Sequence, residues 1–313
     1  MRLGFSYHGS DKIKNLSIFA YGLDEFTRVL SKKGTESDIT LSNRKDDNGI
    51  FTFLTPSRFP EKVSSLTDSI YPSDIAILNG DHISKDLGEV IVALDLMKKT
   101  SGYFITGDSK NIDILRSITK NTSLSNYKFF SGNPMEFLSE LNTVEHKPMF
   151  SNTTVMIDHF FKVKSVGVVA LGFVLGGKVE KHQELNLSYI DKKVQIKSIQ
   201  MHDEDVDSAD SGSRVGLALK GLEVEELERG MVLSDHEFNY VKEFDGKFEP
   251  HPSLKQPVDD EFEFFVSDEM RYQRGMLDRG KASIQTKFLK LNDSFVVSIL
   301  QRTPRICGRM KVS

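Results

Sequence analysis

The chain has one cysteine and no long apolar run, and each scarcity excludes a class of protein. A lone Cys307 cannot form an internal disulfide, so we expect a reducing cytoplasm and a packed strand position for the thiol. The longest apolar runs, such as residues 166–175, are far shorter than the roughly 20 residues that span a bilayer. The N-terminus also lacks the apolar stretch and cleavage site of a signal peptide. We therefore predict no membrane association.

A positive net charge is also missing, because the formal charge is −4 at pH 7. This balance argues against a protein that coats nucleic acid through bulk electrostatics. Basic residues nevertheless concentrate near the end of the chain, where they could form a local phosphate-binding face or an ordinary mixed surface. They are Arg271, Arg274, Arg279, Lys281, Lys287, Lys290, Arg302, Arg305, Arg309 and Lys311.

The first half of the chain alternates between strand-like and helix-like segments. Such alternation predicts a doubly wound α/β domain with a mostly parallel sheet and helices on both faces, which we assign to residues 1–145. A linker follows at 142–154, where Pro148 and a polar cluster interrupt the periodicity. The candidate strands are residues 3–7, 50–54, 75–78, 103–106 and 127–130, and the candidate helices are 13–29, 88–98, 112–119 and 135–141.

The second half of the chain shows no long helical pattern. Strand-like segments recur about every ten residues and are separated by glycine and aspartate, which is typical of all-β barrels. Two barrels, at 155–235 and 236–313, fit this stretch better than one. The predicted fold class is therefore α/β followed by all-β.

Residues 194–234, VQIKSIQMHDEDVDSADSGSRVGLALKGLEVEELERGMVLS, carry the most specific signal. An alternating strand, an acidic loop, a second strand and a Glu-Arg-Gly tail follow one another. Upstream, Gly167 suits a hairpin turn that needs positive φ, and Gly172 suits a close approach between strands. These segments resemble the second domain of the translational GTPases elongation factor Tu and SelB. The resemblance implies a P-loop-GTPase-like domain followed by two barrels of the elongation factor Tu type.

In the tRNA-carrying members of this family the aminoacyl end docks against the second domain. The resemblance assigns that contact to Val166, Gln200, His202 and Asp203. The run is especially similar to the SelB-like factor proposed to serve pyrrolysine in methanogenic archaea. Gln200 and a titratable His202 could hydrogen-bond a terminal ribose or an unusual aminoacyl group, or they could form a polar barrel rim without a ligand.

The resemblance also predicts nucleotide motifs in the first domain, and the sequence departs from each of them. A P-loop reads GxxxxGK[ST], with lysine on the phosphates and a hydroxyl on Mg²⁺. It should follow the strand at 3–7, but residues 8–15 lack the Gly-Lys-Ser/Thr ending. The candidate phosphate ligands that remain there are Gly9, Ser10, Lys12 and Lys14.

Two further nucleotide motifs are similarly altered. The family's Asp-Thr-Pro-Gly-His is replaced by Leu-Thr-Pro-Ser-Arg at 54–58, which keeps Thr55 but none of the residues with a chemical role. The guanine-reading Asn-Lys-x-Asp is replaced at 106–109, where only Asp108 could imitate the family's carboxylate. Losing two charge-assisted contacts implies roughly a hundredfold loss of affinity. We therefore expect no catalytic residue and no ordinary hydrolysis, and GTP and Mg²⁺ are doubtful cofactors.

These patterns favour a SelB-like protein that binds aminoacyl-tRNA or another translation component, with the ribosome and a protein partner as further candidates. Two alternatives stay open: a working GTPase with an altered phosphate site, and a regulatory module that binds only protein. No metal site is predicted, because the eight histidines are scattered and the acidic run at 203–210 lacks the glycine and terminal glutamate of a calcium loop.

Overall fold

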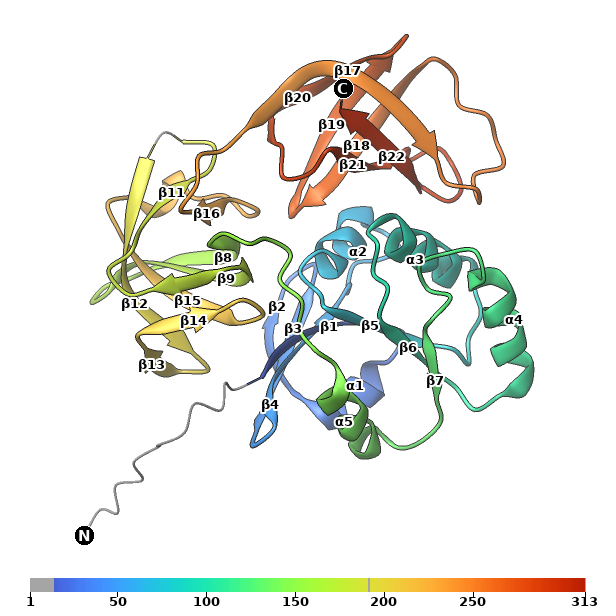
Figure 1. Ribbon diagram of the computed structural model, residues 1–313, viewed down its shortest axis with the longest axis horizontal. Helices are drawn as coiled ribbons and strands as arrows, with labels where there is room; N and C mark the ends of the chain where they lie inside the picture. The colour runs from blue at the N-terminus through green and yellow to red at the C-terminus, as the bar shows by residue number, and fades with distance from the viewer. Residues whose placement is uncertain (1–13, 191, 313) are drawn as a thin grey trace.

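A computed structural model describes residues 14–190 and 192–312 and contains an α/β domain followed by two closed β-barrels (Figure 1). The predicted fold class is confirmed. Within those two described ranges no helix is long and apolar enough to cross a membrane. The candidate strand at 3–7 lies outside the described residues.

The α/β domain is built on one mixed sheet with strand order β2-β3-β4-β1-β5-β6-β7. β4, β1, β5, β6 and β7 run parallel, and β3 pairs antiparallel with both β2 and β4. Its elements are β1 (Asn15–Tyr21), α1 (Asp24–Leu30), β2 (Lys32–Glu36), β3 (Thr40–Asp46), β4 (Gly49–Thr55), α2 (Val63–Ile70), β5 (Ile75–Asn79), α3 (Lys85–Leu96), β6 (Gly102–Ile105), α4 (Ser109–Thr119), β7 (Lys128–Phe130) and α5 (Pro134–Thr143).

The predicted helix over residues 13–29 is wrong, because β1 occupies the first part of that segment and α1 only the second. β1 is buried on both faces: Phe19 packs with α2 and α3, whereas Leu16 and Ile18 pack with α5. Figure 1 shows these helices on opposite faces of the sheet. A strand buried on both faces reads as a continuous apolar run, which periodicity alone does not distinguish from a buried helix.

The other predicted elements of the first domain that fall within the described residues are confirmed, with boundaries that differ by a few residues. Local signals explain some starts: Asn133 and Glu136 form a capping box and Pro134 opens α5. The sequence pattern did not predict α2, β2 or β3. All residues of α2 are buried, including its three serines, so the helix lacks the polar face that reveals most surface helices.

The second unit is a six-stranded barrel in which β11–β12 pairing closes the order β11-β16-β8-β9-β15-β12. Gly172 is required where β9 crosses β8, because a Cβ there would lie 2.3 Å from the Met156 carbonyl oxygen. Its elements are β8 (Thr154–Val163), β9 (Gly167–Gly176), β10 (Lys178–Glu180), β11 (Glu184–Leu187), β12 (Lys192–Met201), β13 (Glu204–Val206), β14 (Ser208–Asp210), β15 (Arg214–Lys220), the 3-10 helix η1 (Val224–Glu226) and β16 (Val232–Ser234).

The third unit is a closed barrel with the order β17-β20-β19-β18-β21-β22. Cys307 lies buried in β22, as expected, and burial raises the pKa of its thiol to about 12. The strands are β17 (Tyr240–Pro250), β18 (Glu261–Glu269), β19 (Arg271–Asp278), β20 (Lys281–Leu289), β21 (Ser294–Ser298) and β22 (Ile306–Val312).

The three units meet around one shared apolar cluster. Ile39 and Leu54 come from the first domain, Met156 and Phe173 from the second, and Leu289 from the third. Figure 1 shows the third barrel above α2 and α3, with the second barrel beside the β2–β3 side of the sheet. The protein therefore buries apolar surface among all three units.

Candidate functional site

The turn after β1 lies where doubly wound domains bind the phosphates of a nucleotide. β1 ends at Tyr21 and α1 begins at Asp24, so only Gly22 and Leu23 connect them. Gly22 has a φ of +68°, and a Cβ at this position would lie 3.1 Å from the Cβ of Asn79. A phosphate loop needs a longer glycine-rich connection that ends in Gly-Lys-Ser/Thr. The two-residue connection in this chain has neither that length nor that ending.

This topology corrects the predicted position of the phosphate loop, which we placed at residues 8–15. The central strand is β1, and Lys14 directly precedes it. The Lys14 ammonium donates to the carbonyls of Leu141 at 2.8 Å and Asn142 at 2.9 Å, so it fastens the end of α5 to the start of β1. Three predicted ligands lie outside the described residues: Gly9, Ser10 and Lys12.

A cleft of about 600 Å³ lies at the carboxyl edge of the sheet, and Thr55 lines it. The lining mixes cations with anions, and Lys33 is paired with Glu36 at 2.5 Å. The hydroxyls of Thr40 and Ser57 lie 2.6 Å apart and bond to each other. The cleft therefore lacks the concentrated positive charge that a polyphosphate requires.

Asp108 lies at the start of α4, where it caps the helix. Its carboxylate accepts hydrogen bonds from the backbone of Lys110 at 2.8 Å and Asn111 at 3.2 Å. These are the hydrogen bonds that an N-cap aspartate typically accepts. Nearby, the Thr106 hydroxyl donates to Asp81 at 2.5 Å. The carboxylate predicted to imitate a guanine-reading group thus already satisfies two backbone amides.

His202 and Asp203 form the two-residue turn of the β12–β13 hairpin, between paired Met201 and Glu204. Their φ values are +49° and +63°, which a type I′ turn requires at both central positions. The exposed Gln200 donates to Asp205 at 2.9 Å across the same hairpin. The structure therefore brings three of the four predicted tRNA contacts together on one hairpin.

Val166 is the exception, because it lies in the β8–β9 turn. Strand register places Gln200 opposite Gly216, and Gly216 opposite Leu171 on β9. Leu171 is five residues beyond Val166, or roughly 16 Å along an extended strand. The Val166 carbonyl instead accepts from Lys197 at 3.3 Å. Val166 therefore does not share a site with His202.

The sequence reasoning missed a buried charge cluster near the hairpin. Asp158 accepts from Arg214 and lies against His159, with both contacts at 2.8 Å. Burial alone would raise the pKa of Asp158, but the charge of Arg214 and the His159 contact lower it to about 2. Burial, with the charge of Lys45 next, lowers the pKa of His202, and Arg214 acts in the same direction. A carboxylate, a guanidinium and the His159 imidazole thus adjoin on this barrel, within electrostatic range of His202.

This cluster keeps hydrogen-bonding capacity that the described residues do not use. Asp158 Oδ1 and Arg214 Nε are both buried and have no partner among them. Unpartnered buried polar atoms are uncommon in folded proteins and often mark sites that bind something. The hairpin is also fixed to the first domain, because Lys45 of β3 pairs with Glu204 at 2.6 Å. The cluster therefore lies at the edge between the first and second units.

Comparison of the sequence with known proteins identifies the family of this chain. The model for elongation factor Tu domain 2 matches residues 167–234. A selenocysteine-specific elongation factor of Methanocaldococcus jannaschii is 46% identical over 81 residues, which cover 26% of this chain and 17% of that protein. An uncharacterized protein of the same organism is 35% identical over 250 residues, covering 79% of this chain and 80% of the other. The chain belongs to the SelB and elongation factor Tu family.

The likeness to a solved SelB structure extends through all three units. The apo form of SelB from Methanococcus maripaludis superposes with a TM-score of 0.77 and 19% identity, and the match covers 96% of this chain and 80% of that one. At this identity the match shows the shared fold. The SelB-like Glu-Arg-Gly tail supplies Arg229, which reaches from the second barrel to the first domain.

The third barrel of this SelB-like chain uses many of its cations internally. Arg305 contacts Glu89 of α3 at 2.7 Å, and Arg309 donates to the Leu96 carbonyl. Lys311 pairs with Glu249 at 2.8 Å. Arg305 and Arg309 therefore pack the third barrel on the first domain, whereas Lys311 is paired within the third barrel.

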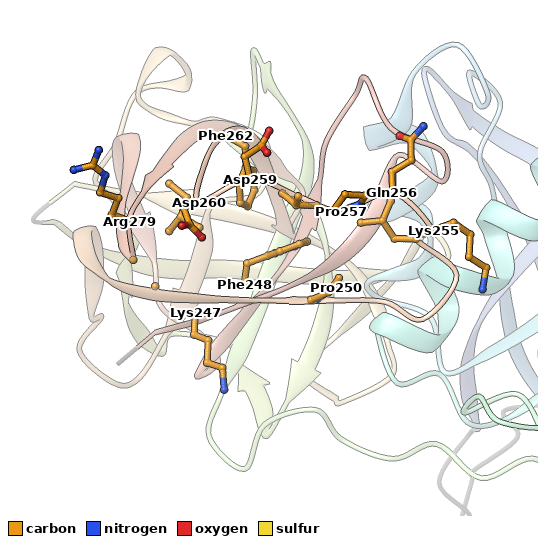
Figure 2. A pocket seen from close by; sticks show the side chains of 15 residues that line it. Lys247, Phe248, Pro250, Lys255, Gln256, Pro257, Asp259, Asp260, Phe262 and Arg279 are labelled. Carbon is orange, nitrogen blue, oxygen red and sulfur yellow. The ribbon is translucent and has the colours of Figure 1, made fainter.

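A cavity of about 900 Å³ opens at one end of the third barrel (Figure 2). Phe248 and Phe262 line it as an edge-to-face pair with centroids 5.1 Å apart. Lys247 and Phe248 are consecutive in β17, so their side chains lie on opposite sides of the strand. Figure 2 shows the Lys247 side chain pointing away from Phe262. The cavity is thus lined by an aromatic pair, with the Lys247 side chain directed away from it.

Proposed function

We propose that the protein is a SelB-like translation factor that binds aminoacylated tRNA and has no GTP-hydrolysis cycle. One observation carries the proposal: two residues connect β1 to α1 in a chain that has both barrels of the family. Phosphoryl transfer depends on positioning the phosphates and their Mg²⁺, and this connection supplies neither a lysine nor a hydroxyl for that work. The first domain then serves as a scaffold for the second and third.

The proposed contact for the aminoacyl end is the cluster around the β12–β13 hairpin. Arg214, held by buried Asp158 at 2.8 Å, offers guanidinium N–H groups, and His202 offers an imidazole whose pKa lies below its usual value. A neutral imidazole can both donate and accept, which suits a terminal ribose or an ester. Because the hairpin resembles that of the SelB-like factor proposed to serve pyrrolysine, pyrrolysine is the candidate aminoacyl group. We also propose that the protein contacts the ribosome.

Calorimetry and tRNA titration test the two halves of this proposal separately. Calorimetric titration with GTP and GDP in the presence of Mg²⁺ should detect no specific binding. A dissociation constant in the micromolar range or lower would refute the scaffold role of the first domain. Fluorescence titration with charged tRNA should show binding that His202→Asn and Arg214→Lys each weaken at least tenfold. Asparagine tolerates the positive φ at this turn, so the hairpin should persist. The matched control is Lys110→Ala on exposed α4.

A second candidate function is a module that binds only protein. The observation that favours it is the internal pairing of cations in the third barrel, including Arg305 with Glu89 and Lys311 with Glu249. Such pairing leaves fewer side chains for a tRNA stem. Absence of charged-tRNA binding even at low salt would select this function over the first.

A further inference from the structure

A second basic and aromatic site lies between the two barrels, away from the β12–β13 hairpin. It is a cavity of about 530 Å³ formed by the β11–β12 connection, the segment that leads into β17, and β20. Figure 1 shows the segment that connects β16 of the second barrel to β17 of the third, and part of this segment lines the cavity. The described lining residues that matter here are Tyr189, Lys192, Lys193, Phe238, Tyr240 and Lys287.

Three aromatic rings line this cavity in a fixed arrangement. The centroids of Tyr189 and Tyr240 are 5.3 Å apart, and those of Phe238 and Tyr240 are 6.4 Å apart. Tyr189 donates its backbone N–H to the Tyr240 hydroxyl at 2.6 Å, and its own hydroxyl accepts from the Leu289 backbone at 2.9 Å. The rings are therefore positioned before any ligand arrives.

Tyr189 adopts a backbone conformation that bulky residues rarely adopt. Its φ is +72°, in the left-handed region where glycine and asparagine are favoured. Strain of this kind costs about 1–3 kcal/mol and persists only where surrounding contacts enforce it. Arg271, whose guanidinium lies 3.9 Å from the Tyr189 ring centroid, adds to those contacts. The chain thus maintains an unfavourable backbone geometry that keeps an aromatic ring beside this cavity.

The charge of the cavity differs from that of the whole protein. Lys193 and Lys287 are exposed and have no carboxylate partner among the described residues, whereas Lys192 is held by Glu226 at 2.8 Å. The Lys287 ammonium lies 4.6 Å from the Tyr240 ring centroid. Glu237 is the one acidic side chain among the described lining residues. A chain with a net charge of −4 therefore presents an excess of cations at an aromatic cavity.

Aromatic rings interleaved with lysines match the chemistry of a nucleotide strand. Single-stranded nucleic acid is bound by stacking bases on aromatic faces while cations follow the phosphates. We propose that this cavity binds a single-stranded RNA segment, with bases against Phe238 and Tyr240 and phosphates near Lys193 and Lys287. This inference rests on the proposed function, because the cavity would be a second contact for the tRNA that the hairpin cluster binds.

This contact is separate from the one proposed for the aminoacyl end. Lys192 and Lys193 begin β12, whereas His202 follows its last residue. Ten residues of extended chain span up to roughly 30 Å. The cavity would therefore engage a different part of a bound RNA from the part held beside Arg214.

The test uses the whole chain and a fluorescently labelled RNA hexanucleotide that has no secondary structure and no aminoacyl group. Anisotropy titration should show salt-dependent binding. The double variant Lys193→Glu/Lys287→Glu should weaken it at least tenfold and lower the salt dependence by about two phosphate contacts. Phe238→Ala should also weaken binding, and Lys120→Glu on exposed α4–β7 surface should leave it unchanged.

Several outcomes would overturn the inference. They are absence of hexanucleotide binding, binding that the double variant leaves intact, and equal affinity for a nucleoside monophosphate, which would indicate a small-nucleotide site. Arg214→Lys separates the two proposals, because it should weaken charged-tRNA binding and leave hexanucleotide binding unchanged. Hexanucleotide binding without charged-tRNA binding would refute the proposed function and retain this site, and the reverse result would do the opposite.

Discussion

Arg229 of the second unit donates a hydrogen bond of 2.6 Å to Asp38 of the first, and its guanidinium also lies 3.3 Å from Asp68 in α2. Burial acts to raise the pKa of Asp38, but Lys62 and Arg229 hold it well below its usual range. Asp38 lies in the turn between β2 and β3. One arginine therefore connects two segments of the first domain to the second barrel.

Removing Arg229 should loosen this junction between the first domain and the second barrel. Arg229→Ala leaves buried Asp68 without its ion-pair partner, whereas Asp38 keeps its contact with Lys62 at 2.7 Å. Breaking a buried pair costs about 3 kcal/mol or more. Denaturant unfolding measures the loss, and small-angle scattering should show a larger radius of gyration.

The matched control is Arg279→Ala, whose side chain is 90% exposed. It should change stability by less than about 0.5 kcal/mol. An Arg229→Ala protein as stable and compact as this control would contradict the role assigned to the junction.

Acid should weaken the contact between the first and third units through Asp95. This carboxylate lies 2.9 Å from His251 Nε2 and accepts from the Ser123 backbone at 2.7 Å. Burial opposes ionisation, but these hydrogen bonds lower the pKa of Asp95 to about 2. A folded-state pKa below the unfolded value of about 3.9 gives stability that is present above pH 4 and lost as pH falls towards 2.

The measurement is the difference in unfolding free energy between the native chain and Asp95→Asn. It should be at most about 2 kcal/mol near pH 6 and shrink towards zero near pH 2. Asp113→Asn on exposed α4 is the control and should show no such trend. A difference independent of pH would show that Asp95 does not contribute through its charge.

Two glycine substitutions should have opposite effects on stability. Gly172→Ala places a Cβ 2.3 Å from the Met156 carbonyl oxygen, so β8 and β9 must separate and the second barrel should lose several kcal/mol. At Gly88 in α3 a Cβ would meet nothing within 4 Å, and Gly88→Ala should stabilise the helix by up to about 1 kcal/mol. Thermal unfolding measures both, and a neutral Gly172→Ala would contradict the close approach.

Much of the fold was predictable from sequence because strand and helix periodicities alternate clearly from residue 75 to 143, whereas the fully buried α2 gave no such pattern. The site was less predictable, for physical reasons. β1 reads as helix because both its faces are buried, and this error displaced the expected phosphate loop towards the N-terminus. Arg214 and Asp158 are 56 positions apart in sequence and meet only through barrel pairing. No local sequence pattern predicts such a pair. The positive φ of Asp203, by contrast, belongs to a hairpin turn that the sequence could have predicted.

The central claim is that this chain binds aminoacylated tRNA without nucleotide control, and one titration tests it directly. The affinity for charged tRNA is measured with no nucleotide, with GTP and with GDP, at two salt concentrations. We predict equal affinity in all three states, weakened by salt and by Arg214→Lys. Binding that requires GTP would contradict the account, because the first domain would then act as a nucleotide-dependent switch.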